Sequence, residues 1–305
     1  PRTHALYKHV MKHIAIYAKK IFKQDLVVFQ SLLSGIEHMG WTPVLEKDLA
    51  LQVQSKFQIR ENYRTFNTHL DLQSGFDLMV SLGGDGTFLK AVSFVRDSEV
   101  PILGVNTGRL GFLSNLSKDH ILQTLQRFNS GQYEFQQRSL LRVHTENDLY
   151  GDENFALNEL TLQKKDTSSM VKVHAYLGDK FLNTYWADGL IVATPTGSTA
   201  YSLSCGGPII TPGCQVHILT PIAPHNLNVR PVVVPDHMPI SLQVEGRDRS
   251  YLLSLDGHSQ HLKQGDKVTI TKAEFMINVV KFEDNNFLDT IRNKMFWGSD
   301  TRNEI

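Results

Sequence analysis

The chain has 305 residues, which exceeds the usual size of a single hydrophobic core, so we expect two domains. Hydrophobic residues make up 41% and charged residues 20%, which is typical of a globular protein and excludes a disordered or fibrous chain. Lysine plus arginine equals aspartate plus glutamate at 31 each, so no overall basic field exists to hold a nucleic acid or an anionic membrane.

Short apolar strands alternate with helical stretches in the first third of the chain. We predict a strand over 13–17 and an amphipathic helix over 27–38. The same alternation continues in the order typical of a parallel sheet, with a strand over 77–82, a helix over 87–96 and a strand over 101–105. Beyond a loop, Ser117 is predicted to cap a further helix.

The pattern changes after about residue 131. From 140 to 280, short runs of Val, Leu, Ile and Thr alternate with Gly, Pro, Asp and Asn, which predicts an all-β segment and favours a sandwich. Gly178 and Asp179 are predicted as a hairpin turn, and 231–235 as a short strand. Residues 286–297 return to a helical pattern, and we expect this helix to pack back on one of the domains.

These elements predict a Rossmann-like parallel α/β domain followed by a β-sandwich domain and a C-terminal helix. We place the α/β domain at 1–130, which 283–305 could join, and the β-rich domain at 131–282. Two cysteines, Cys205 and Cys214, are too few to indicate a disulfide framework, and we expect both thiols to be buried. With no apolar run near the roughly 18 to 20 residues of a membrane span, and no signal-peptide core, we expect a cytoplasmic protein.

The sharpest local motif is Gly83-Gly84-Asp85-Gly86-Thr87, between a predicted strand and a predicted helix. Ligands of open α/β sheets bind at this edge, and glycines followed by a helix N-terminus favour a phosphate. A carboxylate in such a cradle is unfavourable unless it holds a metal or accepts a proton from an attacking hydroxyl. Asp85 is therefore the candidate catalytic residue, although Asp85 as the N-cap of a tight strand-to-helix turn is an equal alternative from this motif alone.

Gly-Gly-Asp-Gly-Thr after an apolar strand resembles the phosphate-binding turn shared by NAD kinases, diacylglycerol-type lipid kinases and phosphofructokinases. Three further segments, in the same order along the chain, are similar to bacterial-type ATP-NAD kinases: 104–113, Asn158-Glu159, and 187–202 with its continuation to 208. On this resemblance the chain is identified as a member of the NAD kinase family. The resemblance implies transfer of the γ-phosphate of ATP, or of another donor, to the 2′-hydroxyl of the adenosine ribose of NAD, giving NADP.

The resemblance also implies site residues. Asp85 would be catalytic, and no residue would be a metal ligand. The implied phosphate- and dinucleotide-binding residues are Gly83, Gly84, Gly86, Thr87, Phe88, Lys90, Asn158, Glu159, Asp188, Thr196, Thr199, Ala200, Tyr201, Ser204, Ala223 and His258.

The chemistry of several of these residues agrees with that assignment. A carboxylate such as Asp188 or Glu159 is the usual acceptor for ribose hydroxyls, Asn158 can donate and accept, and Tyr201 offers a flat face for a ring. From the residues alone, Asp188 in a turn and Tyr201 in the core remain alternatives, as does Lys90 on an exposed helix face. Trp186 stands where the family is frequently basic, so the contacts to the nicotinamide side are not carried over.

No His or Cys cluster has the spacing of a metal site, so the implied metal is Mg²⁺ carried with the phosphates of ATP. The family implies a homodimer or homotetramer formed through the β-rich domain, to which 231–235 could contribute. We expect in-line phosphoryl transfer in a cleft between the domains. A lipid or sugar kinase and a dinucleotide sensor without turnover are the rival functions. The sequence leaves open ATP against polyphosphate, NAD against NADH, and allosteric control.

Overall fold

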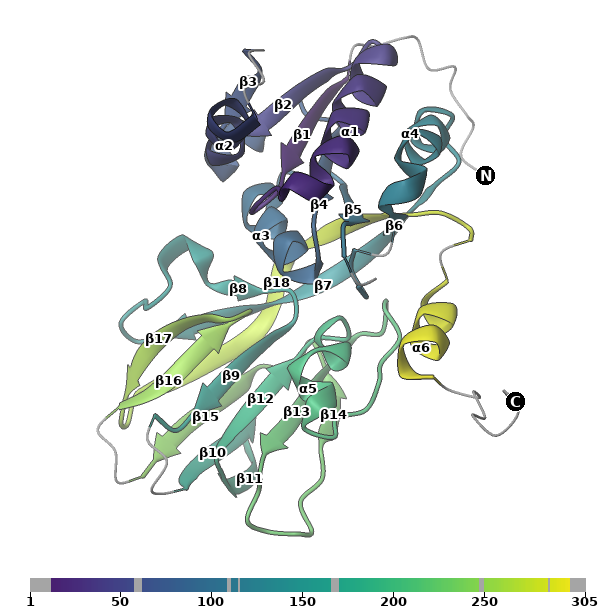
Figure 1. Ribbon diagram of the computed structural model, residues 1–305. Helices are drawn as coiled ribbons and strands as arrows, with labels where there is room; N and C mark the ends of the chain where they lie inside the picture. The colour runs from purple at the N-terminus through teal and green to yellow at the C-terminus, as the bar shows by residue number, and fades with distance from the viewer. Residues whose placement is uncertain are drawn as a thin grey trace. The chain divides into compact units, whose positions relative to one another are not determined.

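The computed structural model describes residues 12–57, 62–108, 111–114, 116–165, 170–246, 250–284 and 286–296. The chain divides into two compact units, of which the first is Pro1–Gln136 with Asn278–Ile305 and the second is Gln137–Ile277 (Figure 1). Among the described residues, no helix is both long enough and apolar enough to cross a bilayer.

The first unit contains a parallel sheet with the order β5-β4-β1-β2-β3, with β6 paired to β5. Each βα step predicted from the sequence is present, and residues 42–66 add two strands and a helix that the sequence analysis left unassigned. The strands are β1 His13–Tyr17, β2 Thr42–Glu46, β3 Arg64–Phe66, β4 Leu78–Leu82, β5 Ile102–Asn106 and β6 Leu116–Ser117. The helices are α1 Leu26–His38, α2 Lys47–Phe57, α3 Asp85–Val95 and α4 Ile121–Asn129.

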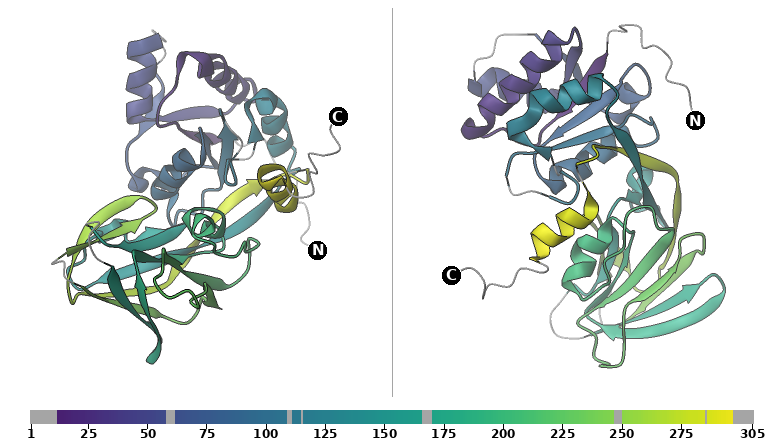
Figure 2. Two further views of the ribbon diagram at one scale, coloured as in Figure 1. Left: turned by 60° about the horizontal axis from the view of Figure 1, so that its bottom comes forward. Right: turned by 90° about the vertical axis from the view of Figure 1, so that its right-hand side faces the viewer.

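The sheet of the first unit is buried where its central strands lie. All five residues of β4 are buried, as expected for a parallel strand covered on both faces. Helices α1 and α4 pack side by side (Figure 2). A Cβ at Gly35 of α1 would lie 2.6 Å from the end of the Leu122 side chain of α4, so the two helices approach closely at this glycine.

The second unit contains two packed sheets, and the predicted sandwich is confirmed. One sheet has the order β11-β10-β15-β18, with β7 paired to β18 and to β8; the other has the order β14-β13-β12-β9-β16-β17. The bounds of the first set are β7 Glu134–Thr145, β8 Phe155–Ala156, β10 Val171–Leu177, β11 Lys180–Ala187, β15 Ile240–Glu245 and β18 Lys267–Lys281. Those of the second are β9 Glu159–Gln163, β12 Gly189–Ala193, β13 Val216–Ile222, β14 Val232–Pro235, β16 Ser250–Leu255 and β17 His258–Lys263.

Alternation along the strands gives the six-stranded sheet two different faces. Leu160 and Leu162 of β9 enter the main core of the unit, together with Leu190 of β12 and Leu253 of β16. The opposite face carries Glu159, Thr161 and Gln163 of β9 beside their partners on β12. This second face is the one that carries polar candidates.

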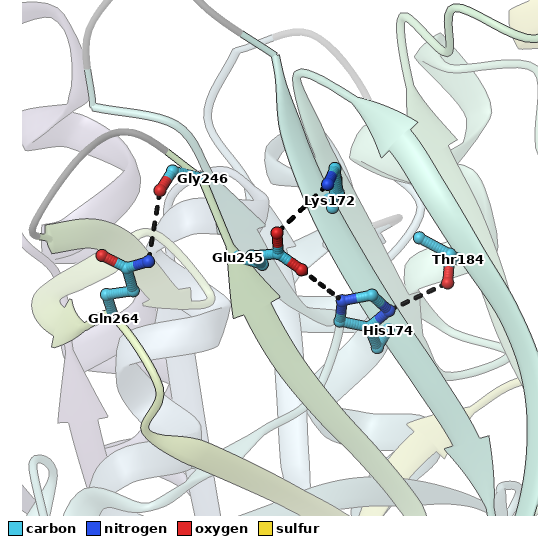
Figure 3. Close-up of polar contacts among 6 residues, drawn as sticks. All are labelled: Lys172, His174, Thr184, Glu245, Gly246 and Gln264. Atoms are coloured by element: carbon cyan, nitrogen blue, oxygen red, sulfur yellow. Dashed lines mark hydrogen bonds and ion pairs between the residues drawn. The ribbon is translucent and has the colours of Figure 1, made fainter.

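A polar network on the other sheet joins three of its strands, β10, β11 and β15 (Figure 3). His174 lies between Thr184 Oγ1, 2.9 Å from its Nδ1, and Glu245 Oε2, 3.3 Å from its Nε2. Lys172 Nζ donates to Glu245 Oε1 at 3.1 Å, and this hydrogen bond lowers the pKa of Glu245. No candidate site residue takes part, so the network serves strand pairing at the surface.

Short helical segments interrupt the β-rich region, which the sequence analysis expected to lack them. The four-residue helix α5 Tyr201–Ser204 follows a 3-10 turn at Gly197–Thr199. A further 3-10 turn of the second unit occupies Gly151–Glu153, and those of the first unit occupy Lys23–Asp25, His69–Leu72 and Lys118–His120.

The C-terminal helix α6 Phe287–Met295 belongs to the first unit, as the predicted return of the chain requires. Asn286 caps it, accepting from Leu288 N at 2.8 Å. The rings of Phe112 and Phe287 lie 6.4 Å apart, and Lys294 lies over the ring of Phe112. The helix therefore packs against the segment after β5, residues 108–114, which we call the second glycine loop.

Both cysteines are free thiols, but the prediction that both are buried was wrong. Cys205 is partly buried and packs on the small apolar cluster of Ile191, Ala193 and Ile218. Cys214 is exposed, because it follows Gly213 in a turn before β13.

Candidate functional site

The glycine turn of the first unit lies where β4 ends and α3 begins. Gly83 N donates to Val105 O of the neighbouring strand, and φ of Gly83 is 152°. A side chain at this position would lie 2.4 Å from Thr87 Oγ1, so only glycine fits. At Gly84 and Gly86, by contrast, an added Cβ would meet no atom within 4 Å, so the backbone there is open to a ligand.

Helix α3 presents its positive end at this turn. Thr87 N and Phe88 N both donate to Gly84 O, which starts the helix. The amides of Asp85 and Gly86 precede Thr87 N, the first amide that donates within the helix, and so have no intrahelical partner. An eleven-residue helix whose first amides have no intrahelical acceptor favours an anion at this end.

Asp85 does not cap the helix, because the N-cap position is Gly84. The Asp85 carboxylate turns instead to the second glycine loop, where Oδ2 accepts from Phe112 N at 2.9 Å and Oδ1 accepts from Leu113 N at 3.1 Å and Ser114 N at 2.9 Å. The alternative reading of Asp85 as an N-cap was therefore wrong. Since Oδ2 accepts one of these bonds, it keeps a lone pair for a further donor.

The second glycine loop approaches Asp85 closely. A Cβ built on Gly111 would lie 1.9 Å from Asp85 Oδ1. Asn106 secures the rest of the described loop, because its Nδ2 donates to Ser114 O at 3.1 Å and its Oδ1 accepts from Gly108 N at 2.7 Å. Arg109 and Leu110, part of the segment that carries the family resemblance, lie outside the described residues.

Two candidates on α3 differ in their access to solvent. Phe88 is fully buried and its ring lies 3.0 Å from the position of a Cβ on Gly104, so its side chain packs in the core. Lys90 is exposed, and its Nζ lies 5.5 Å above the ring of Phe94.

The second unit holds the remaining candidates, beginning with the pair at the start of β9. Asn158 is buried and Glu159 is partly buried. Burial, followed by the charge of Asp256, raises the pKa of the Glu159 carboxyl to about 8, and the Tyr201 amide opposes the shift. Glu159 is therefore largely protonated at neutral pH and can donate a hydrogen bond.

Asp188 lies at the other end of β9. Its Oδ1 is 2.6 Å from Lys164 Nζ, and Lys164 N donates to Asp188 O at 3.0 Å. The next residue, Gly189, begins β12, and a side chain there would lie 2.4 Å from Leu162 O. Asp188 forms the bend between β11 and β12, which is compatible with the alternative of an Asp-Gly turn. Asp188 N donates to Ile222 O, which brings Asp188 next to Ala223, an exposed residue with φ of 44°.

Tyr201 lies between the two ends of β9. Its amide donates to Glu159 and its hydroxyl accepts from Gln163 Nε2 at 3.1 Å. Its side chain is 38% exposed, so the alternative of a core tyrosine was wrong. Ser204, also exposed, follows in the same helix α5.

The turn before α5 is tightly held. Thr196 is buried and its Oγ1 accepts from Arg138 at 3.3 Å, while Thr199 Oγ1 donates to Thr196 O at 3.2 Å. Ala200 N donates to Gly197 O at 2.9 Å. Thr196 therefore supports the turn from inside, whereas Thr199 and Ala200 are partly exposed.

His258 is an exposed residue at the start of β17. Its ring lies 5.7 Å from that of Tyr150 in an edge-to-face contact. The residue two positions earlier, Asp256, donates from its amide to Glu159 O at 3.1 Å, so the β16–β17 turn adjoins the start of β9.

Within each unit, the structure thus brings candidates together. Gly83, Gly84, Gly86 and Thr87 lie beside Asp85 in one turn. In the second unit, Glu159 on one face of the six-stranded sheet lies beside Tyr201 of α5, and Asp188 immediately precedes β12. Sequence reasoning missed Lys164 and gave no role to Asp256. The Asp-Gly pair between two alternating strands could have identified Asp256 as a turn residue. No local pattern could have identified Lys164, because its partner Asp188 is distant in the sequence.

Two other features carry no candidate residue. A cavity of about 590 Å³ in the first unit lies between α1 and α4 and is lined by residues such as Val27, His38 and Leu122. Within the part of the chain that the structure describes, no group of three His, Cys, Asp or Glu side chains could hold a metal ion.

Comparison with known proteins covers both units. The family model of the ATP-NAD kinase N-terminal domain matches residues 18–133, and that of the ATP-NAD kinase C-terminal domain matches residues 157–282. An NAD kinase of Flavobacterium psychrophilum is 47% identical over 260 residues, covering 85% of this chain and 88% of that protein. An NAD kinase of Flavobacterium johnsoniae is 42% identical over 292 residues, covering 95% and 99%.

Solved structures give the same result. Yeast NADH kinase complexed with NADH superposes with a TM-score of 0.85 at 25% identity, covering 97% of this chain and 90% of that chain. An NAD kinase from Archaeoglobus fulgidus in complex with ATP gives a TM-score of 0.71 at 24% identity over 94% and 99% of the two chains, a likeness of fold.

Proposed function

The chain belongs to the NAD kinase family, and on that premise we propose how its residues share the work of the reaction. The enzyme is a phosphotransferase that uses ATP to phosphorylate NAD and so yields NADP. The added phosphate is on the 2′-hydroxyl of the adenosine ribose.

The glycine turn binds the donor phosphates. The open backbone at Gly84 and Gly86 and the first amides of α3 support this assignment, because amide donors at a helix N-terminus suit phosphate oxygens. Thr87 adds a hydroxyl beside them. Lys90, one turn further along α3, contributes positive charge at longer range.

Asp85 acts on the reacting hydroxyl, and its geometry is the observation that carries this proposal. Three amides of the second glycine loop fix its carboxylate, so the group is held in place and cannot swing freely. The remaining lone pair on Oδ2 accepts the proton of the 2′-hydroxyl as that oxygen attacks the γ-phosphorus. Because phosphoryl transfer has a loose transition state, positioning of this kind supplies much of the catalysis.

The acceptor dinucleotide binds to the second unit. Asp188 accepts hydrogen bonds from ribose hydroxyls, and the ion pair with Lys164 partly neutralises its negative charge. Protonated Glu159 donates a hydrogen bond to an oxygen of the dinucleotide, and Asn158 both donates and accepts hydrogen bonds. The exposed ring of Tyr201 stacks on a planar group. The other contacts assigned to NAD come from Thr199, Ala200, Ser204, Ala223 and His258, with Thr196 supporting them from beneath.

Magnesium enters with ATP. Mg²⁺ retains several waters and commonly binds the phosphates of its substrate, so we assign the ion to the phosphate oxygens of ATP. When bound there, Mg²⁺ neutralises charge on the phosphate that is transferred.

The protein works in the cytoplasm as a homodimer or homotetramer. Strand β14 lies at one edge of its sheet and exposes Val233, which suits it for a subunit contact. The molar mass in solution at micromolar concentration, measured by light scattering, tests this. A monomer with full activity would exclude the assembly.

The purified protein, ATP, Mg²⁺ and NAD provide the test of function, with NADP detected by an NADP-specific dehydrogenase. NADH is a second candidate acceptor, because a yeast NADH kinase is structurally similar to this chain. The expected result is NADP formation that depends on ATP. Tight binding of NAD with no product from ATP or polyphosphate would instead support a sensor.

A further inference from the structure

Asp256 and Gly257 form the two-residue turn of the β16–β17 hairpin, in which Leu255 pairs with His258. Their φ values, 46° and 88°, are the positive values that a type I′ turn requires. Asparagine suits the first position of such a turn at least as well as aspartate. The shape of the turn therefore does not explain why this residue carries a carboxylate.

The carboxylate of Asp256 reaches the start of β9. Oδ2 accepts from Leu157 N at 2.7 Å, and Oδ1 accepts from Asn158 N at 2.9 Å and from Glu159 N at 3.0 Å. Three successive amides are thus satisfied by one side chain. In return, Asp256 N donates to Glu159 O.

The same stretch of backbone is held from its other side by the residues after β12. Thr194 Oγ1 donates to Leu157 O at 2.5 Å, and Thr194 N donates to Asn158 O at 2.9 Å. A side chain at Gly197 would lie 2.1 Å from Asn158 O, so that contact is close as well. The position of the Asn158-Glu159 pair therefore depends on Asp256 on one side and Thr194 on the other.

We propose that Asp256 is a positioning residue for NAD, which fixes the backbone amides of 157–159 and so sets the direction of the Asn158 and Glu159 side chains. The proposal rests on the assignment of those two side chains to the dinucleotide. The charge of Asp256 also helps, after burial, to raise the pKa of Glu159, and so keeps Glu159 able to donate.

The test compares Asp256→Asn with the matched control Asp236→Asn. Asp236 is another buried acid of the second unit, and its carboxylate pairs with Lys272 Nζ at 2.7 Å, away from β9. Asparagine at 256 keeps the turn but faces the three amides with a single carbonyl oxygen. Because an amide is then left without an acceptor, we expect the Kd of NAD, measured by calorimetry, to rise roughly tenfold.

The kinetic readout separates positioning from general destabilisation. For Asp256→Asn we expect the KM of NAD to rise about tenfold while the KM of ATP and kcat change by less than about threefold. Asp236→Asn should lower the melting temperature without moving the KM of NAD. The proposal is overturned if Asp256→Asn binds NAD as wild type does, or if it raises the KM of NAD and of ATP equally.

Two further variants cover a failure of folding and a failure of the premise. If Asp256→Asn does not fold, Thr194→Val removes the hydroxyl on the other side of the segment, and the same selective rise in the KM of NAD is expected; an unchanged KM overturns the proposal.

Asn158→Ala should weaken NAD binding directly. If it does not, the assignment of the pair to NAD is wrong and the proposal falls with it, whereas weak binding by Asn158→Ala and normal binding by Asp256→Asn overturn the proposal alone.

Discussion

Gly111→Ala tests the link between Asp85 and the second glycine loop. The added methyl group would lie 1.9 Å from Asp85 Oδ1, so either the loop or the carboxylate must move. Three hydrogen bonds of 2.9 to 3.1 Å join them, and each bond to a charged acceptor is worth about 1.5 to 3 kcal/mol. With two of the three lost, we expect a cost of about 3 to 6 kcal/mol.

Hydrogen exchange at the amides of 112–114 is the appropriate assay, because the two units need not unfold together. In Gly111→Ala these amides should lose protection, and the first unit should unfold at lower urea. Gly108→Ala is the control, since a Cβ there would meet nothing within 4 Å.

A double-mutant cycle isolates the contact. In an Asp85→Ala background the carboxylate is gone, so Gly111→Ala should cost far less, which gives a coupling energy of about 2 kcal/mol or more. The reasoning is refuted if Gly111→Ala is as stable as Gly108→Ala, or if its cost is the same in both backgrounds.

The remaining predictions concern the second unit. Asp188→Ala should raise the KM of NAD at least tenfold and that of ATP by less than about twofold, because its partner belongs to the acceptor; steady-state kinetics beside Asp179→Ala, an exposed hairpin acid, check this. The Glu159 carboxyl has its pKa raised from 4.5 to about 8 in the folded state, so folding retains a proton there and stability should fall as pH rises from about 4.5 to 8. Between pH 5 and pH 8 the wild type should lose on the order of 3 kcal/mol of unfolding free energy through this group, and Glu159→Gln should not show that loss in urea unfolding. An equal change in unfolding free energy for the two proteins would exclude the raised pKa. Burial lowers the pKa of His217 to about 4, so stability should also fall as pH drops from about 6.5 to 4, and His217→Gln should lack that loss.

Periodicity and turn residues predicted much of this fold. The apolar run of β4, the glycines after it and the strand of β5 identify a parallel βαβ unit without any knowledge of distant contacts. Residues 42–66 were left unassigned because β2 contains Pro43 and passes directly into α2 with no turn residue between them, and because β3 has only three residues. Helix α5 was missed because a single turn has no measurable period. Its Ser202 Oγ lies 2.8 Å from Thr220 Oγ1 of β13.

The internal contacts of the candidate site could not be predicted from the sequence. The sequence analysis treated Asp85 as either a base or a helix cap, whereas its carboxylate accepts from amides 27 to 29 residues away. Lys164 beside Asp188, and Asp256 beneath Asn158, follow from strand pairing. Such pairs depend on the register of distant strands, which no local pattern encodes.

The kcat of Asp85→Asn, at saturating NAD and ATP, tests the role of Asp85 most directly. Asparagine cannot accept the hydroxyl proton, and removing a positioned proton acceptor costs about 10²- to 10⁴-fold in rate. The variant should also be less stable, because one amide of the second glycine loop loses its acceptor, so activity must be measured well below its melting transition. We predict a fall in kcat of that size with a Kd for NAD within about threefold of wild type, and a folded variant that retains more than about a tenth of wild-type kcat would contradict the account.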